Sequence, residues 1–275
     1  MSVTVCVAGD VMLDLLVTAQ TGLVPDDDVP ASVTVGPGGQ AANVAAWVAH
    51  LGGAARLFGP RCTDPVGDLL DRQLADRGVR LAAPRVGDRS GAVLSLTAGG
   101  VRTMASDPGD LAWVGPALAD PAWLSGADWL HLSGYLLLRA ADPGPVLAAA
   151  RAAHAAGAGV SLDLTSAAMV AAFGPGLFAA LVQDLEPQLV FGTEGEWDVL
   201  RVTGSWTAVV KRGAAGFAVV ASGVEREYAA VPGPVLDVTG AGDALAAGFL
   251  VGGPALAARA AAACVAILGA QPVRP

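Results

Sequence analysis

Positive charge is scarce in this sequence. Its 275 residues include 16 Lys and Arg against 25 Asp and Glu, Lys211 is the only lysine, and the formal net charge is −9. A protein that binds nucleic acid needs a basic face for the phosphate backbone, so we expect no nucleic-acid partner. A single nucleotide is compatible with this composition, because a few N–H groups and one or two cations can hold a triphosphate.

Cysteines are few and widely spaced. Cys6, Cys62 and Cys264 are odd in number and form no C-x-x-C pair. This spacing argues against a disulfide framework or a zinc site. It is typical of buried free thiols in a reducing compartment.

Long uninterrupted apolar runs are also missing. The first ten residues include no basic segment, and Asp10 and Asp14 interrupt the apolar residues around them, so we expect no signal peptide. The most apolar later stretch, 254–270, is rich in alanine and includes Arg259, which favours a core helix over a membrane span. We expect a cytoplasmic protein without a membrane partner.

Hydrophobic residues make up 53% of the chain and charged residues 15%, which is enough for one large α/β core. Apolar β-prone runs alternate with helical segments, and this rhythm predicts a mostly parallel sheet with helices on both faces. The expected strands are 3–7, 29–35, 54–58, 129–132, 160–164, 189–191, 208–210 and 217–220. The expected helices are 40–51, 64–77, 143–156, one within 175–183, 194–202 and 244–251.

One β-rich segment interrupts this rhythm. The runs 92–96 and 101–105 are joined by Gly99 and Gly100, which is typical of a hairpin. We expect the hairpin to leave the main sheet and to pair with 29–35. The resulting small β lid would be formed from about 13–37 and 88–110.

A glycine-rich stretch, Asp237-Val-Thr-Gly-Ala-Gly-Asp243, precedes an apolar helix near the end of the sequence. Gly240 and Gly242 permit a tight turn and a close approach of ligand to backbone. The first turn of a helix has free N–H groups and the positive end of the helix dipole, which together attract an anion such as a phosphoryl group. Asp243 either caps this helix or accepts the proton of an attacking hydroxyl, and this stretch alone leaves both roles open.

A second glycine-rich stretch, 36–41, satisfies the pattern G-x-G-x-x-A. In a dinucleotide-binding fold the pattern follows the first strand, with an acid about 20 residues further on. Here the first strand ends at Gly9-Asp10, and no acid lies between Gly39 and Asp64. An oxidoreductase is therefore disfavoured, and the chain has no P-loop pattern. We expect the glycines to end the strand before helix 40–51.

Asn43 lies in the first part of this otherwise apolar helix. A buried amide without a partner is costly, so we expect it to bind something, and a polyol hydroxyl is suitable.

Together, Gly38-Gly39-Gln-Ala-Ala-Asn43 and Asp237-Val-Thr-Gly-Ala-Gly-Asp243 resemble the two signatures of the ribokinase-like (PfkB) carbohydrate kinase family. Their order, their separation and the β lid between them also match. So do Gly9-Asp10-Val-Met-Leu-Asp14 and Gly213-x-x-Gly216. The resemblance covers nearly the whole chain, and it implies a single kinase domain over 1–275 with a three-layer α/β fold and a small lid.

The resemblance implies a role for each matching residue. Asp243 would be the general base, and Gly240, Ala241 and Gly242 would form the anion hole. Asp14, Gly38, Gly39 and Asn43 would bind sugar hydroxyls, and Thr193, Lys211, Gly213 and Gly216 would lie on the nucleotide side. Glu196 would hold Mg²⁺ through water, while Asp237 and Thr239 would belong to a monovalent-cation (K⁺) site. Met12, Gln40 and Gly134 depart from ribose-specific relatives, and Thr193 stands where the family usually has Asn.

Simpler interpretations of these residues remain open. Asp14 could be a solvated loop residue, Glu196 an exposed acid in the first turn of a helix, and Lys211 a strand-end lysine with its ammonium in water. The function that the resemblance implies is ATP- and Mg²⁺-dependent phosphorylation of a hydroxymethyl group on a small sugar or related polyol. Because the lid would expose a β face, we also expect two copies to pair through it. The alternatives are a nucleoside kinase of the same family and a sugar- or nucleotide-binding protein without useful catalysis.

Overall fold

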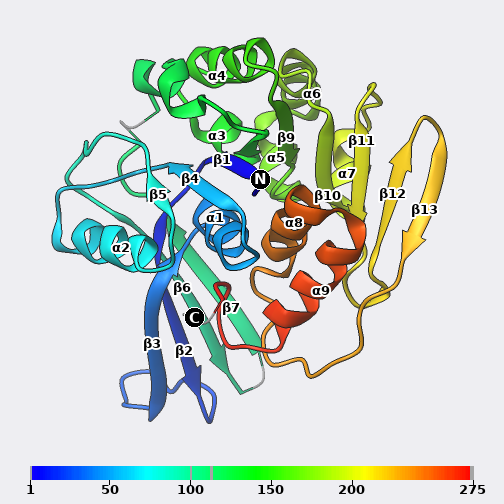
Figure 1. Cartoon of the computed structure of the whole chain (residues 1–275). Helices are drawn as coiled ribbons and strands as arrows, with labels where there is room; N and C mark the ends of the chain where they lie inside the picture. Colours follow the sequence, from blue (N-terminus) through cyan, green and yellow to red (C-terminus); the bar gives the residue numbers. More distant parts are fainter. Residues whose placement is uncertain (1, 100, 112–113, 273–275) are drawn as a thin grey trace.

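Two sheets organise the chain (Figure 1). The computed structural model describes residues 2–272 apart from residues 100, 112 and 113. The larger sheet has nine strands in the order β13-β12-β11-β10-β9-β8-β1-β4-β5. Its strands are β1 Thr4–Ala8, β4 Ala54–Phe58, β5 Arg80–Leu81, β8 Trp129–Ser133, β9 Gly159–Asp163, β10 Leu189–Thr193, β11 Thr207–Lys211, β12 Phe217–Ala221 and β13 Val224–Tyr228. Neighbouring strands are parallel except in the pairs β11–β12 and β12–β13, so the predicted, mostly parallel sheet is confirmed.

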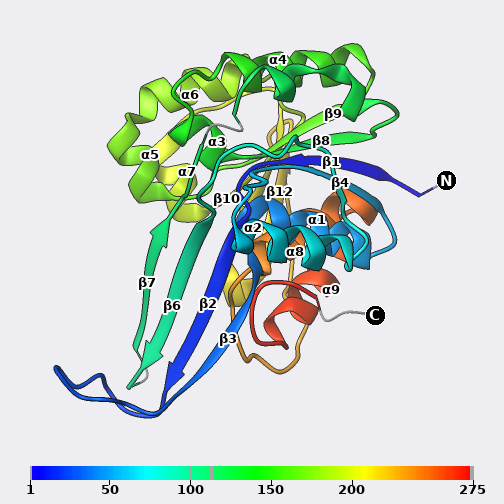
Figure 2. The same ribbon diagram turned by 90° about the vertical axis from the view of Figure 1, so that its left-hand side faces the viewer.

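Helices cover both faces of this sheet (Figure 2). On one face lie α1 Gln40–His50, α2 Pro65–Ala75, α8 Ala241–Gly252 and α9 Pro254–Val265. On the other lie α3 Gly134–Arg139, α4 Gly144–Ala155, α5 Ala167–Phe173, α6 Pro175–Asp184 and α7 Glu194–Leu200. Single 3-10 turns are η1 Pro116–Ala119, η2 Pro121–Leu124 and η3 Gly213–Ala215. The three-layer α/β arrangement that the sequence predicted is thereby confirmed.

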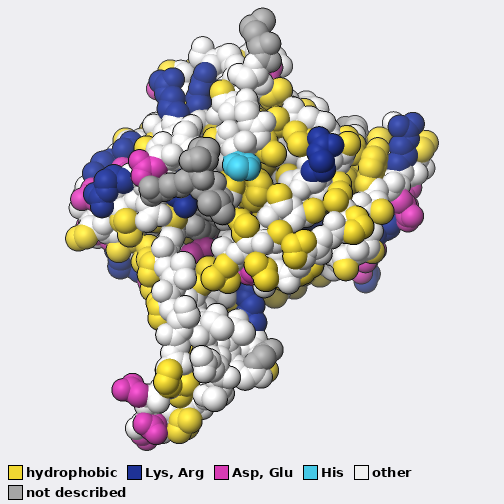
Figure 3. All heavy atoms as spheres, turned by 60° about the horizontal axis from the view of Figure 1, so that its bottom comes forward, with side chains coloured by type: hydrophobic (Ala, Val, Ile, Leu, Met, Phe, Trp, Pro, Cys, Tyr) yellow, Lys and Arg dark blue, Asp and Glu magenta, His cyan; other side chains and the backbone are white. Residues whose placement is uncertain are grey.

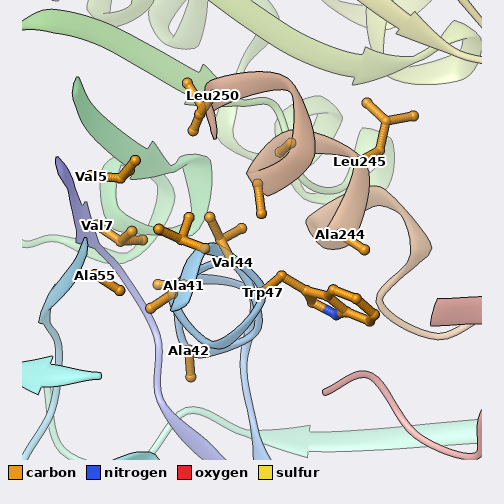
Figure 4. Packing of buried hydrophobic residues seen from close by; sticks show 14 of the residues in the cluster. Val5, Val7, Ala41, Ala42, Val44, Trp47, Ala55, Ala244, Leu245 and Leu250 are labelled. Carbon is orange, nitrogen blue, oxygen red and sulfur yellow. The ribbon is translucent and has the colours of Figure 1, made fainter. Parts of the chain in front are cut away.

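Side chains point alternately to the two faces of the large sheet, so the hydrophobic interior is divided into two cores, one on each face. In β1, Val5 and Val7 pack with α1 and α8, whereas Cys6 and Ala8 pack on the opposite face, because successive side chains of a strand point to opposite sides. Figure 4 shows α1 lying between β1 and α8, with Ala41 on the side of β1 and Val44 on the side of α8. The buried residues of α8 in this core include the small Ala244 and Ala247, which let the two helices approach closely, and the start of α1 lies beside the start of α8.

The smaller sheet has the order β3-β2-β6-β7 and extends away from the body (Figure 2). Its strands are β2 Met12–Ala19, β3 Ala31–Gly38, β6 Gly91–Ala98 and β7 Val101–Asp107. Figure 3 shows this sheet as an arm with acidic side chains at its far end, where the β2–β3 loop contains the exposed Asp26, Asp27 and Asp28. The predicted hairpin is present as β6 and β7, and Gly100 of its turn lies outside the described residues. That this sheet acts as a lid stays a prediction.

Two predictions about this sheet are wrong. The segment 29–35 was expected to pair with the hairpin, but β3 pairs with β2, and β2 pairs with β6. The glycines of 36–39 were expected to end the strand, but β3 continues to Gly38, opposite Met12. Pro37 is tolerated there because β3 is an edge strand, where a missing N–H costs no ladder hydrogen bond.

Several short elements were not predicted, namely β5, β13, α3 and α5. The free thiols are confirmed, since Cys6, Cys62 and Cys264 are all buried and unpaired. Among the described residues no single helix is long and apolar enough to cross a membrane. The helices α5 and α6 together reach that length and apolar composition, but the chain bends by 100° between them.

Candidate active site

The carboxyl ends of five parallel strands meet at one edge of the large sheet. Asp10 follows β1, and Ser133, Asp163, Thr193 and Lys211 are the last residues of β8, β9, β10 and β11. Register pairs Ser133 with Asp163 and Thr193 with Lys211. In the strand order β1 lies between β4 and β8, so the chain builds the sheet outward from β1 in two directions. Open α/β sheets bind ligands at such topological switch points.

The loop 237–243 lies between two cavities at this edge. One cavity of about 520 Å³ is lined largely by glycine, alanine and valine, and includes Val238 and Ala241. The other, of about 270 Å³, is polar and includes Thr239 and Asp243. The residues of this loop thus alternate between the two spaces. Gly213 and Gly216 line the larger cavity, whereas Asp14, Gly39 and Asn43 line the smaller one.

The start of α8 presents free backbone N–H groups between these cavities. Gly240 precedes the helix with a φ of 77°, and a Cβ there would lie 2.5 Å from the Cβ of Ala270, so only glycine fits. The Ala241 amide donates to the Val238 carbonyl at 3.3 Å, which corrects its predicted availability to a ligand. Over the part of the chain that is described, the amides of Gly242 and Asp243 have no acceptor, and they can bind an anion.

Asp243 is the third residue of α8 and does not cap it, so the capping interpretation is wrong. Its Oδ2 accepts a hydrogen bond of 2.8 Å from Nδ2 of Asn43. Burial raises the pKa of the Asp243 carboxyl well above its ordinary value; the Asn43 bond lowers it, the Asp163 charge raises it and the Lys211 charge lowers it. The result is a buried carboxyl with increased proton affinity.

Asn43 has the partners that a buried amide was expected to need, and the protein supplies two of them; its contact with a ligand hydroxyl stays a prediction. It is 5% exposed, and besides the bond to Asp243 its Oδ1 accepts from Nε2 of Gln271 at 3.2 Å. An amide has two N–H donors and two acceptor lone pairs. One donor and one lone pair of Asn43 therefore remain for a ligand.

Asp14 lies in the strand β2 and lines the smaller cavity, so it is not a solvated loop residue. A Cβ on Gly38 would lie 2.0 Å from its carboxyl group, and a Cβ on Gly39 would lie 2.6 Å from the Asp10 carbonyl. The two glycines therefore make room for the carboxylate and for the turn into α1. Burial, with a contribution from the Asp10 charge, raises the pKa of Asp14 to about 6, although the Arg102 charge lowers it.

Lys211 is held by Asp163, a residue that the sequence analysis missed. Its Nζ lies 2.7 and 3.0 Å from the two carboxylate oxygens of Asp163, which is only 1% exposed. A Cβ on Gly242 would lie 3.3 Å from this Nζ, so the ammonium group reaches the start of α8 and does not extend into water. Burial lowers the pKa of Lys211, but the charges of Asp163 and Glu196 outweigh this and raise it. An acid that ends a buried strand was the available signal for Asp163.

Thr193 and Glu196 form a reciprocal capping box at the start of α7. The Thr193 amide donates to Glu196 Oε2 at 2.8 Å, and the Glu196 amide donates to the Thr193 hydroxyl at 3.3 Å. Glu196 is 7% exposed, so it is not the exposed first-turn acid of the simpler interpretation. Burial raises its pKa, although the Lys211 charge and the Thr193 bonds lower it. One carboxylate oxygen of Glu196 remains uncommitted.

Asp237 and Thr239 bind each other and the protein. Oδ1 of Asp237 accepts from the Thr239 amide and hydroxyl, and Oδ2 accepts from the Gly269 amide. Arg102 of β7 donates to the Thr239 hydroxyl at 2.7 Å. Burial raises the pKa of Asp237, but these hydrogen bonds outweigh it and lower it. Oδ2 of Asp237 accepts only the one hydrogen bond, so it retains a lone pair for a cation.

Asp10 was part of a sequence motif but had no assigned role. Its carboxylate accepts from the Gln40 amide at 3.0 Å and from the Ser133 hydroxyl at 3.1 Å. It therefore ties the end of β1 to the start of α1 and to β8. Nowhere in the described ranges do three or more His, Cys, Asp or Glu side chains form a cluster that could by itself hold a metal.

Known proteins resemble this chain over nearly its whole length. Residues 3–267 match the profile of a family described as pfkB family carbohydrate kinase. A fructokinase of Escherichia coli is 30% identical over 92% of this chain and 85% of its own, and an ATP-dependent ribose-1-phosphate kinase of Halopiger xanaduensis is 32% identical over 90% and 84%. The structure of adenosine kinase from Sinorhizobium meliloti superposes with a TM-score of 0.85 at 23% identity, covering 99% of this chain and 97% of its own.

Proposed function

Because this chain belongs to the pfkB family of carbohydrate kinases, we propose that it transfers the γ-phosphoryl group of ATP to a hydroxymethyl group of a small sugar or related polyol, with Asp243 as the general base. The observation that carries the proposal is the position of the loop 237–243 between an apolar cavity and a polar one. A donor and an acceptor bound in these cavities would meet at the start of α8.

Asp243 has the environment that a base requires. Its raised pKa makes the carboxylate a better proton acceptor than an exposed one. The Asn43 bond occupies Oδ2 and leaves Oδ1 to accept the proton of the attacking hydroxyl. A protein that only bound its ligand would gain nothing from a buried carboxyl at this position, which disfavours the non-catalytic alternative.

Charge on the transferred group would be stabilised by the start of α8 and by Lys211. Phosphoryl transfer depends mainly on positioning and on electrostatic stabilisation. The amides of Gly242 and Asp243 and the positive end of the helix dipole supply fixed donors, and the Gly240 turn directs them toward the ligand. The Lys211 ammonium, next to Gly242, adds a positive charge whose position the Asp163 pair maintains.

The nucleotide would occupy the larger cavity, with its base against the apolar lining and its phosphates near Gly213 and Gly216. Thr193 contributes through the capping box that positions Glu196. Mg²⁺ usually keeps several waters and binds one or two carboxylates together with substrate phosphates, so Glu196 with its free oxygen suits a water-mediated role. A bound Mg²⁺ would neutralise charge on the phosphates. A K⁺ ion at 237–239 would be held by Oδ2 of Asp237, which accepts only the Gly269 amide, together with backbone carbonyls.

The acceptor would bind in the smaller cavity, where Asp14, Gly39 and Asn43 meet the inner face of the small sheet. Closure of this sheet over the acceptor would exclude water and limit ATP hydrolysis. The sheet also exposes apolar side chains, among them Val33 and Val101, and we propose that two copies pair through it.

The proposal is tested by ADP release from Mg-ATP with a panel of pentoses, hexoses, sugar acids, sugar phosphates and nucleosides. We expect one class to give turnover that requires Mg²⁺ and yields a phosphomonoester of the acceptor. Turnover with nucleosides alone would shift the assignment to the nucleoside kinase alternative. Ligand-induced stabilisation without ADP from any compound would overturn the kinase activity.

A further inference from the structure

Two arginines line the polar cavity, and nothing in the proposed reaction uses them. Resting on the proposed function, we infer that the acceptor carries an anionic group, a phosphate or a carboxylate, in addition to its hydroxyls, and that Arg102 and Arg139 bind this group. Both side chains border the cavity that contains Asp14 and Asp243.

Arg102 comes from the small sheet and faces the cavity together with its neighbours on that face. Its Nε donates to the Ser95 hydroxyl at 3.0 Å and its Nη2 to the Thr239 hydroxyl at 2.7 Å. Both partners are neutral, and within the described ranges no carboxylate forms an ion pair with it. Its Nη1 group remains available to a ligand.

Arg139 ends helix α3 on another side of the cavity. Its Cζ lies 4.4 Å from the centroid of the Tyr135 ring, which also borders the cavity. This cation–π contact fixes the plane of the guanidinium group. Arg139 has neither a hydrogen bond nor an ion pair to any part of the chain that the structure describes, so its donors are free.

The carboxylates of the same cavity are mostly satisfied by the protein. Asp10 accepts from Gln40 and Ser133, and Asp243 accepts from Asn43. Asp14 alone accepts no hydrogen bond from the described residues, and it suits ligand hydroxyls. Asp14 thus supplies an acceptor without a protein partner and the two guanidinium groups supply free N–H donors, and together these groups complement a hydroxylated anion.

Guanidinium groups favour phosphate and carboxylate, because their planar set of N–H donors matches two oxygens at once. Closure of the small sheet around a neutral sugar would remove water from guanidinium N–H donors that have few acceptors in the described protein, which is unfavourable. An anionic acceptor removes this penalty. The cavity of about 270 Å³ lies at the small end of ligand pockets, which are roughly 300–1,000 Å³, so the acceptor is small.

The test compares matched neutral and anionic ligands by calorimetry on Asp243→Asn, with saturating ADP to block the phosphate sites of the nucleotide. The pairs are ribose with ribose 1-phosphate, fructose with fructose 1-phosphate, and glucose with gluconate. We expect the anionic member of at least one pair to bind roughly tenfold to hundredfold more tightly, as for charge-assisted hydrogen bonds. The phosphate and carboxylate pairs distinguish the two kinds of anion.

Arginine variants assign the effect to the cavity. Adding Arg139→Met or Arg102→Met should remove the preference, Arg139→Lys should restore part of it, and the exposed Arg151→Met on α4 should leave it intact. Equal binding of both members in every pair, no binding of any member, or a preference that survives both Met variants would overturn the inference.

Turnover of the unsubstituted chain separates this inference from the proposed function. If neutral sugars bind as tightly as their anionic counterparts and are phosphorylated, the kinase stands and the inference fails. If anionic acceptors bind in an arginine-dependent manner but yield no ADP, the inference stands and the proposed function fails.

Discussion

Nδ2 of Asn43 donates to Oδ2 of Asp243 at 2.8 Å, and this bond joins two residues that are 200 positions apart in the sequence. One belongs to α1 and the other to α8, and the two helices pack through small buried side chains (Figure 4). The fold thus brings the two glycine-rich motifs to one site. Asn43 positions the carboxyl group of the proposed base, and its remaining donor and lone pair are available to a ligand.

Asn43→Ala should therefore impair catalysis more than acceptor binding. Without this donor the buried carboxyl of Asp243 loses a hydrogen bond that lowers its pKa, so its pKa should rise further. The acidic limb of the kcat–pH profile should move to higher pH, and kcat at neutral pH should fall about tenfold or more, since an unsatisfied buried acceptor costs about 1–3 kcal/mol. Gln271→Ala, which removes only the second partner of Asn43, is the control; an unmoved limb in Asn43→Ala contradicts this account.

The Asp163–Lys211 pair should be costly to break from one side. Lys211→Met leaves a carboxylate with 1% exposure and no cation, and such a change typically costs about 3–5 kcal/mol. Adding Asp163→Asn should recover part of that loss, because the orphaned charge is gone. Denaturant unfolding of the two single variants and the double variant measures the coupling; additive losses would show that the pair is not a unit.

Gly240→Ala should destabilise the fold as well as the site. The new Cβ would require a positive φ and would lie 2.5 Å from the Ala270 Cβ, for a cost of about 1–3 kcal/mol. Gly176→Ala in α6 meets no atom within 4 Å and should be neutral or stabilising by up to about 1 kcal/mol. Thermal unfolding of both variants compares them. Equal melting temperatures would contradict the backbone argument.

Acceptor affinity should depend on pH through Asp14. Its pKa is raised to about 6, so the carboxylate that accepts ligand hydroxyls is present above that pH and is lost as pH falls below it. The Kd of an acceptor whose own charge is constant should rise below about pH 6, and Asp14→Asn should bind more weakly but without that dependence. Calorimetry between pH 5 and 8 measures it. A flat profile in the unsubstituted chain would exclude Asp14 from acceptor binding.

The sequence predicted the framework well because its elements have strong local patterns. Helix 40–51 and strand 54–58 have clear periodicity and glycine boundaries, and the structure has them as α1 and β4. The pairing of β2 with β6 was not recognised, because pairing between segments about 80 residues apart leaves no local trace. The pairing of β2 with the nearby β3 was also missed, because β2 itself was not predicted as a strand. The glycines 36–39 were interpreted as the end of a strand, but the strand continues to Gly38. Gly38 instead leaves room for the Asp14 carboxylate, which a side chain at this position would displace.

Site partnerships were less predictable than site residues. Asn43 and Lys211 were singled out by type and position, but their partners Asp243 and Asp163 depend on tertiary packing. Arg139 carried no motif, and only its place beside Tyr135 and the polar cavity draws attention to it. Contacts between side chains that are distant in the sequence can be identified only when the order of the strands in the sheet is known.

The most direct test of the proposed mechanism is kcat of Asp243→Asn with the preferred acceptor, measured alongside the affinity for ATP. General bases contribute about 100- to 10,000-fold, so we predict a fall of that size in kcat with the Kd for ATP within a few-fold of the unsubstituted chain. A kcat close to that of the unsubstituted chain would show that Asp243 is not the base.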